Sequence, residues 1–190
     1  MSEAPETRRE QIVREAAHLF AVRGFHGVSV EDLGAALGIS GPALYKHFPN
    51  KAAVLAEMLV GISEHLLAGG QREAAAADPP TLIARLVDFH VDFALSRPDL
   101  IRVQDRDIEN LTETDARKVR RLQRRYVEIW VDALCASDAE LEADEARIRA
   151  HAAFGLLNST PYSADRTDPD AARPVLRTMA LAALIPLGVT

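Results

Sequence analysis

Apolar side chains recur along this chain at the three- and four-residue spacing that places them on one side of an α-helix. The first such run ends at Gly24, a residue type that often terminates helices. Strand-like alternation, internal repeats and low-complexity segments are absent from the sequence. The pattern predicts an all-α fold of about nine helices, over residues 7–23, 29–38, 40–48, 50 into the 70s, 80–97, 99–108, 112–136, 144–160 and 170–187.

The fourth predicted helix is long and carries apolar residues from Val54 to Leu66. It leaves a small group of three helices at the N-terminus. At 190 residues the chain is long enough to bury a substantial core but short for two large independent domains. We therefore expect an N-terminal three-helix domain, residues 1–51, and a C-terminal helical domain, residues 52–190, with the long helix as a mechanical link.

The stretch from Val28 to Phe48 pairs two short helices across a tight turn. Ser29 and Asp32 have the spacing of an N-cap residue and its capping-box partner. Gly38 suits the left-handed backbone that ends a helix. These signals predict that the first helix of the pair lies between Ser29 and Gly38.

In the second helix of this pair, Ser40 is placed to act as the N-cap, and Pro42 falls in the first turn. Leu44 and Phe48 give the helix one buried side. The outward side then holds Ala43, Tyr45, Lys46 and His47. The arrangement is typical of a DNA-binding helix-turn-helix, although an ordinary helical hairpin of a larger core shows the same pattern.

Residues 12–51 resemble the DNA-binding region of the TetR family of bacterial repressors. The likeness covers about a quarter of the chain, and its most specific part is the run LYKHFPNK after a glycine-ended helix. The residues that carry it are Ala16, Phe20, Gly24, Phe25, Ser29, Val30, Ile39, Leu44, Tyr45, His47, Phe48 and Lys51.

The resemblance implies that two such heads enter successive major grooves of a palindromic operator. We expect Tyr45, His47 and Lys51 to contact phosphates, and Ser29 to offer its hydroxyl and a helix N-terminus to another phosphate. The remaining members of the expected DNA-binding set are Ser40, Gly41, Pro42, Ala43 and Lys46, of which the last four approach base edges.

The net charge of −6 is unusual for a DNA-binding protein, and it is unevenly distributed. Residues 1–51 hold six basic and six acidic side chains, so the rest of the chain carries the whole net charge. A neutral head predicts modest nonspecific affinity for DNA and dependence on dimerisation.

The single cysteine, Cys135, suits a reducing cytoplasm, and the charged N-terminus lacks an apolar signal core. No stretch approaches about 18 uninterrupted apolar residues.

Several aromatic and polar residues fall on the inward sides of the later helices. In the architecture that the resemblance implies, a ligand cavity lies among them, and a packed core with a satisfied histidine explains the pattern equally well. The candidate pocket residues are Met58, Ile62, His65, Phe89, His90, Phe93, Leu122, Tyr126, Trp130, Phe154 and Asn158.

A basic run on the seventh predicted helix faces away from its apolar side, as on many surface helices. A solvated face explains it more simply than an anionic ligand does. The run consists of Arg117, Lys118, Arg120, Arg121, Arg124 and Arg125.

The last two long helices are apolar on nearly every side, which requires a cover such as a partner subunit. In resembling proteins these helices form a two-fold four-helix dimer interface, whereas packing within one chain is the alternative. The candidate interface residues are Ala152, Ala153, Gly155, Leu156, Met179, Ala182 and Ala183.

The sequence shows no metal-ligand spacing and no glycine-rich phosphate loop, so we expect neither an enzyme, a cofactor nor a metal site. We expect a cytoplasmic, homodimeric repressor that a small hydrophobic effector releases from a palindromic operator. Segments such as RRYVEIWVDAL resemble TetR-type regulators of lipid catabolism, which makes an acyl-coenzyme A thioester a candidate effector. An apolar drug-like molecule or a free fatty acid fits nearly as well. The alternative is a helical interaction dimer or adaptor that does not bind DNA.

Overall fold

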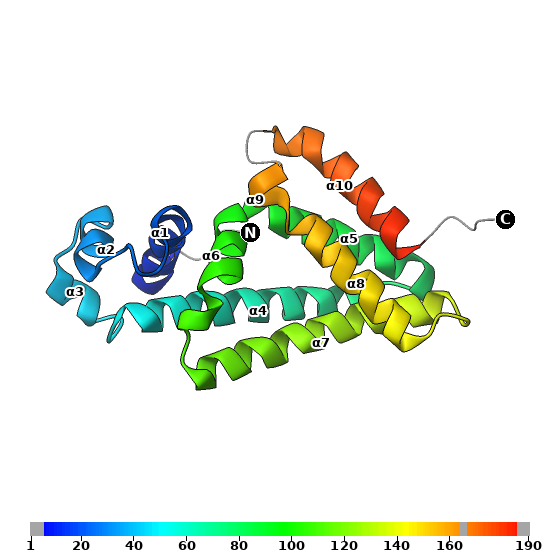
Figure 1. Ribbon diagram of the computed structural model, residues 1–190, viewed down its shortest axis with the longest axis horizontal. Helices are drawn as coiled ribbons and strands as arrows, with labels where there is room; N and C mark the ends of the chain where they lie inside the picture. The colour runs from blue at the N-terminus through cyan, green and yellow to red at the C-terminus, as the bar shows by residue number, and fades with distance from the viewer. Residues whose placement is uncertain (1–5, 164–166, 186–190) are drawn as a thin grey trace. The chain divides into compact units, whose positions relative to one another are not determined.

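The computed structural model describes residues 6–163 and 167–185, and every regular element in these ranges is a helix. The predicted all-α fold is confirmed. Figure 1 shows the elements, which are α1 (Arg8–Arg23), α2 (Val30–Ala36), α3 (Gly41–Tyr45), α4 (Lys51–Ala76), α5 (Pro79–Ser96), α6 (Pro98–Asp107), the one-turn η1 (Ile108–Asn110), α7 (Glu113–Ser137), α8 (Ala143–Leu157), α9 (Thr160–Ser163) and α10 (Pro169–Leu184).

The chain divides into two compact units. The first unit holds the described part of Met1–Ile62 together with Asp99–Val119, and the second holds Ser63–Pro98 with the described part of Arg120–Thr190. Both α4 and α7 therefore contribute residues to each unit. This division follows packing, whereas the expected boundary at residue 51 concerns function and stays a prediction.

Local sequence signals determine where several helices begin. Ser29 and Asp32 form the predicted capping box of α2, with Ser29 N donating to Asp32 Oδ2 at 2.8 Å and Asp32 N donating to Ser29 Oγ at 3.0 Å. Thr112 likewise accepts from the amide of Asp115 at 3.2 Å, and Asn50 Oδ1 caps α4 through the Ala53 amide at 2.8 Å. These caps satisfy amides that would otherwise lack a helical partner.

The ends of α1 and α2 confirm the role expected of glycine. Gly24 has a φ of +77° and Gly38 a φ of +64°, in the region that side chains with a Cβ rarely adopt. The Ile39 amide then donates to Gly34 O at 2.9 Å, which holds the tight turn before α3. The chain thus reverses over a few residues between two short helices.

One capping bond and one helix end differ from the prediction. Ser40 occupies the N-cap position of α3, but its side chain makes no capping hydrogen bond. The eighth helix was expected to run to residue 160, before Pro161, whereas α8 ends at Leu157 and Pro161 lies in the first turn of the short α9. Proline fits there because the first-turn amides have no partner within the helix.

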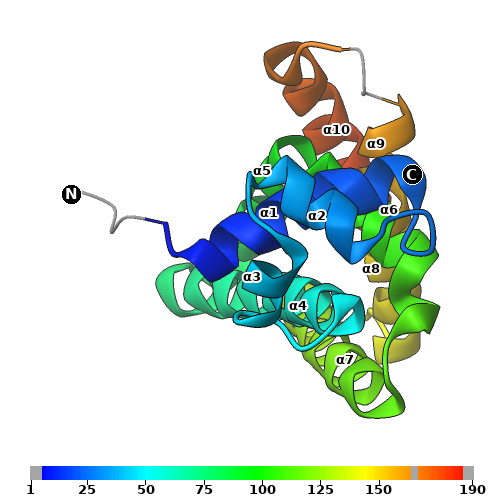
Figure 2. The ribbon, with the colours of Figure 1, turned by 90° about the vertical axis from the view of Figure 1, so that its left-hand side faces the viewer.

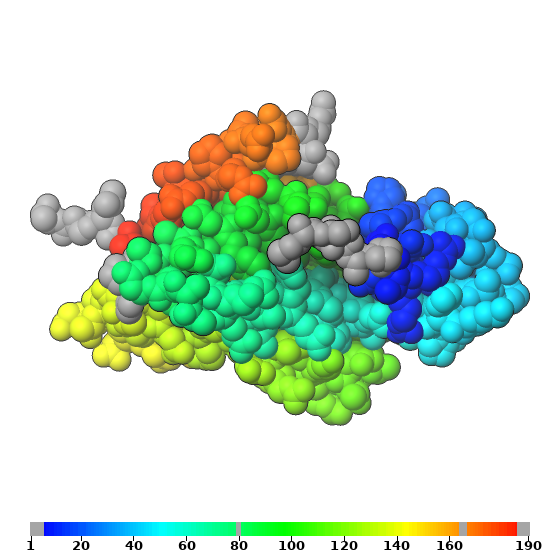
Figure 3. All heavy atoms as spheres, turned by 180° about the vertical axis from the view of Figure 1, so that it is seen from behind, coloured from blue at the N-terminus to red at the C-terminus, as the bar shows by residue number. Residues whose placement is uncertain are grey.

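In the second unit, α10 packs against both α5 and α8 (Figure 1). Arg177 Nε donates to Asp88 of α5 at 2.6 Å, and Arg149 of α8 donates to the Leu184 carbonyl at 3.3 Å. Buried Leu176, Ala180 and Leu184 form the inner side of α10. The space-filling view places α10, drawn orange to red, on the outer surface (Figure 3).

Close packing of α4 in the second unit depends on Gly69 and Gly70. A Cβ at Gly69 would lie 1.9 Å from Phe89 Cζ, and a Cβ at Gly70 would lie 2.7 Å from Tyr126 Cε2. Rings from α5 and α7 therefore pack directly on the α4 backbone. By length and composition alone α4 is apolar enough to cross a bilayer, but half of its most apolar window is buried inside the protein, as in a core helix.

Candidate DNA-binding head and effector site

The helix-turn-helix of α2 and α3 buries its apolar side and exposes a polar one. Leu33, Leu44 and Phe48 are buried, as the sequence predicted, whereas Tyr45 is 53 % exposed. Figure 2 shows α1, α2 and α3 from the side of this head. Of the expected DNA-binding residues, Ser29, Ser40, Pro42, Tyr45 and Lys46 are exposed, and Gly41, Ala43, His47 and Lys51 are half-buried.

The Ser29 hydroxyl is already engaged within the head. It donates to Asp32 Oδ2 at 2.7 Å, in addition to accepting from the Asp32 amide. These bonds, with a smaller contribution from Arg23, lower the pKa of the Asp32 carboxyl. The acidic side chain stays ionised at the start of α2, where the helix dipole favours negative charge.

Lys51 has a different position from the one expected of a phosphate ligand. Its Nζ donates to the carbonyl oxygens of Phe25 and Val28, both at 2.7 Å, and lies 4.4 Å from the centre of the Phe25 ring. Two of the three ammonium donors thus hold the turn between α1 and α2 against the start of α4. The structure assigns Lys51 first to the integrity of the head.

Two arginines at the start of α1, which the sequence analysis did not single out, brace the same unit. Arg8 Nη2 donates to the Leu37 carbonyl at 3.0 Å, at the end of α2. Arg9 donates to the His47 carbonyl, pairs with Glu57 of α4 and lies 4.1 Å over the Phe48 ring. No local pattern predicts these bonds because their partners lie 29 to 48 residues away.

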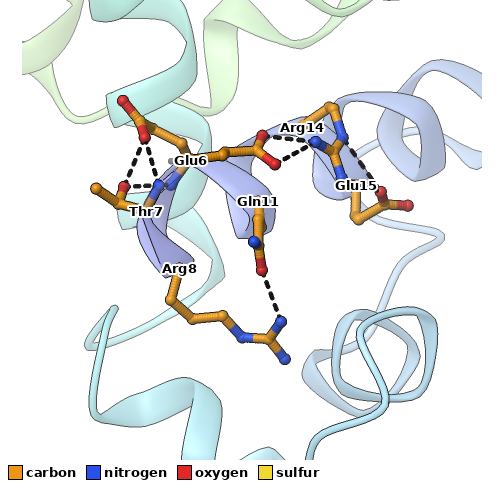
Figure 4. A network of polar contacts seen from close by, with 7 residues as sticks. Glu6, Thr7, Arg8, Gln11, Arg14 and Glu15 are labelled. Carbon is orange, nitrogen blue, oxygen red and sulfur yellow. Dashed lines mark hydrogen bonds and ion pairs between the residues drawn. The ribbon is translucent and has the colours of Figure 1, made fainter. Parts of the chain in front are cut away.

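The first turns of α1 are themselves held by a polar network (Figure 4). Thr7 and Glu10 form a capping box, with Thr7 N donating to Glu10 Oε2 at 2.7 Å. Arg14 pairs with Glu6 at 2.5 Å and with Glu15 at 3.1 Å. The network keeps Arg8 and Arg9 on an ordered helix.

Helix α6 ties into the C-terminal end of α1 within the first unit. Arg106 donates to the Phe20 carbonyl and, at 3.3 Å, to the Ala21 carbonyl. The buried Asp107 accepts from the Phe25 amide at 3.3 Å and pairs with Arg106 at 3.1 Å. The last carbonyls of α1 therefore receive donors from α6 instead of from water.

In the second unit, several of the expected pocket residues come together around His90. Its imidazole stacks on Tyr126 at a centroid distance of 5.9 Å and an interplanar angle of 16°. Phe154 lies 5.1 Å from His90 and 4.9 Å from Trp130, and Phe93 lies 5.8 Å from His90. We call His90, Tyr126, Trp130, Phe154 and Asn158 the aromatic cluster.

Hydrogen bonds within the aromatic cluster hold His90 in place. Its Nδ1 lies 3.2 Å from the Tyr126 hydroxyl and its Nε2 lies 3.1 Å from Asn158 Oδ1. Burial lowers the pKa of His90 to about 4, against a smaller raising effect from Asn158, and burial raises the pKa of Tyr126. Both side chains are uncharged at neutral pH.

The other expected pocket residues lie around or outside this cluster. His65 is exposed, with its ring 5.8 Å from that of Phe89 and 6.5 Å from that of Phe93. Leu122 is buried on α7, whereas Met58 and Ile62 are buried residues of the first unit. The basic run on α7 is exposed or half-buried, and Arg117 pairs with Glu113.

The outer faces of α8 and α10 are apolar and uncovered in the single chain. Ile148, Val175 and Met179 are 70 %, 57 % and 52 % exposed. Of the expected interface residues, Ala152, Gly155, Met179, Ala182 and Ala183 are exposed, and Leu156 is half-buried. Ala153 is fully buried in the protomer, so the structure places it in the core of its own chain and not on the outer face.

Two family descriptions match this chain over separate stretches. Bacterial regulatory proteins of the tetR family match residues 12–58, and the tetracyclin repressor-like C-terminal domain matches residues 77–162. The chain belongs to the TetR family. The recognition drawn from residues 12–51 is thereby confirmed, and the second match covers residues 77–162, which include the segment RRYVEIWVDAL.

Individual TetR-family proteins are similar to this chain over most of their own length. The HTH-type transcriptional repressor KstR2 of Rhodococcus jostii (strain RHA1) is 27% identical over 164 residues, which is 84% of this chain and 78% of that protein. The regulator PfmR of Thermus thermophilus has a TM-score of 0.83 at 26% identity, over 97% of this chain and 100% of that chain. AibR, solved with isovaleryl coenzyme A and operator DNA, has a TM-score of 0.74 at 17% identity, over 91% of this chain and 97% of that chain. At this identity the similarity is one of fold alone.

TetR-family proteins are DNA-binding transcriptional regulators, and most of them are repressors. They bind operator DNA, dimerise and bind small-molecule effectors.

Proposed function

We propose that this TetR-family protein is a homodimeric repressor that a small hydrophobic effector releases from a palindromic operator. The observation that carries the proposal is the exposed side of α3, held on a capped and internally braced helix-turn-helix within residues 12–58. Tyr45 and Lys46 project from this side and are exposed. Such a function belongs in the cytoplasm and assigns no catalytic step to any residue.

The charge of the head supports specific binding over nonspecific binding. Five of the six basic side chains in residues 1–51 make hydrogen bonds or ion pairs within the described head, namely Arg8, Arg9, Arg14, Arg23 and Lys51. Lys46 is exposed with no bond to the described residues. Few cations are left for phosphates, so backbone amides and the Tyr45 hydroxyl must supply much of the positioning.

We infer that the effector binds at the aromatic cluster, because its buried side chains combine apolar surface with a few placed polar atoms, as ligand sites do. The complex of AibR with isovaleryl coenzyme A shows that a protein of this fold accepts a thioester. In this chain, however, Arg121 and Arg124 are exposed while Tyr126 and Trp130 on the same helix are buried. That placement weighs against these arginines as phosphate ligands, and an acyl-coenzyme A thioester stays one candidate among apolar effectors.

The homodimer is inferred from the exposed apolar face of α8 and α10. A single copy leaves Ile148, Val175 and Met179 in water, which is unfavourable for so many large apolar side chains on neighbouring helices. A second copy related by two-fold symmetry would cover the same residues with themselves. Dimerisation would also double the number of phosphate contacts.

The test measures binding of the protein to the DNA upstream of its own coding region, by fluorescence anisotropy at several salt concentrations. Wild type should bind specifically, and Tyr45→Ala should lose at least about tenfold in affinity, because a positioning contact is worth about 1–2 kcal/mol. Tyr162→Phe, a change on α9, is the matched control and should bind as wild type does. If wild type binds this DNA no better than an unrelated sequence, the alternative of a helical adaptor that does not bind DNA replaces the proposal.

A further inference from the structure

The aromatic cluster contains one buried donor without an acceptor. Trp130 is 1 % exposed, and its Nε1–H has no hydrogen-bond partner, the one such buried side-chain atom among the described residues. Burial raises the pKa of the Tyr126 hydroxyl and the nearby indole N–H opposes that effect, but Trp130 Nε1 meets no acceptor with hydrogen-bond geometry. Buried donors are rarely left unsatisfied in folded proteins, so this N–H needs an explanation.

The neighbouring polar atoms already have partners. With Asn158 Oδ1 facing Nε2, His90 carries its proton on Nε2 and donates to the amide oxygen. The His90 Nδ1 atom is then the acceptor for the Tyr126 hydroxyl proton. The chain runs from Tyr126 through His90 to Asn158 and leaves the Trp130 N–H outside it.

The cluster carries no formal charge with which to bind an anion. His90 is neutral because burial lowers its pKa to about 4, and Tyr126 and Asn158 are neutral as well. Burial, followed by the charges of Arg97 and Arg72, lowers the pKa of the exposed His65, which lies outside the cluster. Arg121, Arg124 and Arg125 on α7 are exposed, whereas Tyr126 and Trp130 are buried.

We propose that the effector is an uncharged, largely apolar molecule whose carbonyl-type oxygen accepts a hydrogen bond from Trp130 Nε1. This inference rests on the proposed ligand-responsive function and narrows its chemistry to neutral ketones, esters or thioesters, to the exclusion of free carboxylates. A ketone-type oxygen satisfies the buried donor and brings no charge. An ionised carboxylate would enter a neutral, buried site with no cation beside it, which is strongly unfavourable.

A matched series of probes tests this on the full-length protein. The probes are 2-octanone, octanoate and octane, titrated at neutral pH by calorimetry and by the emission of Trp130, which is the single tryptophan of the chain. We expect 2-octanone to bind at least about tenfold more tightly than octanoate, because only the anion must shed its hydration without a partner. It should also shift the Trp130 emission, whereas octane should bind without that shift.

The variant Trp130→Phe keeps an aromatic ring and removes the N–H. It should weaken 2-octanone binding roughly five- to tenfold and leave octane binding unchanged, as expected for one lost hydrogen bond. Tyr162→Phe, at an exposed position of α9, is the control and should bind all three probes as wild type does. Thermal unfolding of Trp130→Phe checks that the variant is folded.

Equal binding of 2-octanone and octanoate, an unchanged 2-octanone affinity in Trp130→Phe, or no binding of 2-octanone would overturn the inference. In the last two cases the Trp130 N–H is a defect of the core or is satisfied by water. Operator binding by wild type is measured separately without any probe. If it is present, only the effector class is wrong, and if it is absent, the proposed function itself fails.

Discussion

Individual side chains of the head have structural roles that residue type alone does not reveal. Lys51 belongs to the run LYKHFPNK, yet its ammonium group binds two carbonyl groups 23 and 26 residues earlier in the chain. Lys46, five residues before it, is exposed. The two lysines should therefore respond differently to the same substitution.

Lys51→Ala removes both hydrogen bonds and leaves two half-buried carbonyls without a donor. The free energy of unfolding should fall by about 2–3 kcal/mol, since bonds from charged donors are worth more than neutral ones. Lys46→Ala should leave stability unchanged and weaken operator binding, because Lys46 is exposed and is expected to approach base edges. Urea unfolding and DNA-binding titrations measure the two effects. Unchanged stability in Lys51→Ala would contradict the assignment.

The burial of His90 predicts how the stability of the protein depends on pH. Its pKa in the folded protein is about 4, against the ordinary value of 6.5. Below pH 6.5 the unfolded chain takes up a proton that the folded protein does not, so stability falls as the pH drops toward 4. By pH 4 the free energy of unfolding has fallen by about 3 kcal/mol. No such loss occurs above the ordinary pKa, because His90 is then neutral in both states.

The matched variant for this effect is His90→Gln, which keeps hydrogen-bonding atoms but does not titrate. Urea unfolding of both proteins between neutral pH and acid isolates the contribution of His90 from that of the other groups. Wild type should lose stability more steeply than the variant. Parallel curves would show that His90 is not buried as a neutral ring.

The limits of sequence reasoning at this scale are physical. Helical spacing correctly placed Leu44, Phe48, Tyr126 and Trp130 on buried sides, because burial follows periodicity. It gave no sign of the bond between His90 and Asn158, whose residues are 68 apart in the chain. Pairings of that kind depend on how helices pack, which a single sequence does not contain.

Helix boundaries were predicted best where the residues at the helix ends give a capping or terminating signal. The capping box of Ser29 and Asp32 and the left-handed Gly38 confirm α2 as predicted. The end of α8 was misjudged because Pro161 is equally compatible with the first turn of a new helix. Similarly, Arg106 caps α1 from another element, which no local signal announces.

The packing of α2 on the turn before α3 depends on Gly34. A Cβ at this position would lie 2.7 Å from the Ile39 carbonyl oxygen, which belongs to the backbone and cannot rotate away. Gly34→Ala should lower the free energy of unfolding by about 1–3 kcal/mol and weaken DNA binding. Gly61→Ala is the control, because a Cβ there meets nothing within 4 Å and alanine favours the helix by about 1 kcal/mol. Equal stability of the two variants would contradict the close approach.

The assembled molecule should be a dimer through the outer face of α8 and α10. In Ala183→Arg or Gly155→Arg a charge would enter an apolar interface, at a cost of several kcal/mol. Both variants should sediment as monomers at micromolar concentration, where wild type is dimeric. Ala75→Arg, at an exposed position of α4, should leave the dimer intact. A wild type that sediments as a monomer would remove this face as the interface.

The central claim is that the dimer places two helix-turn-helix heads on one operator. The most direct measurement is a nuclease footprint of the wild-type protein on the DNA upstream of its own coding region. We predict two protected half-sites related by two-fold symmetry and spaced about one helical turn or a multiple of it, at about 34–36 Å per turn. The protection should disappear in Tyr45→Ala. A single protected half-site, or uniform protection that competitor DNA abolishes, would contradict the account.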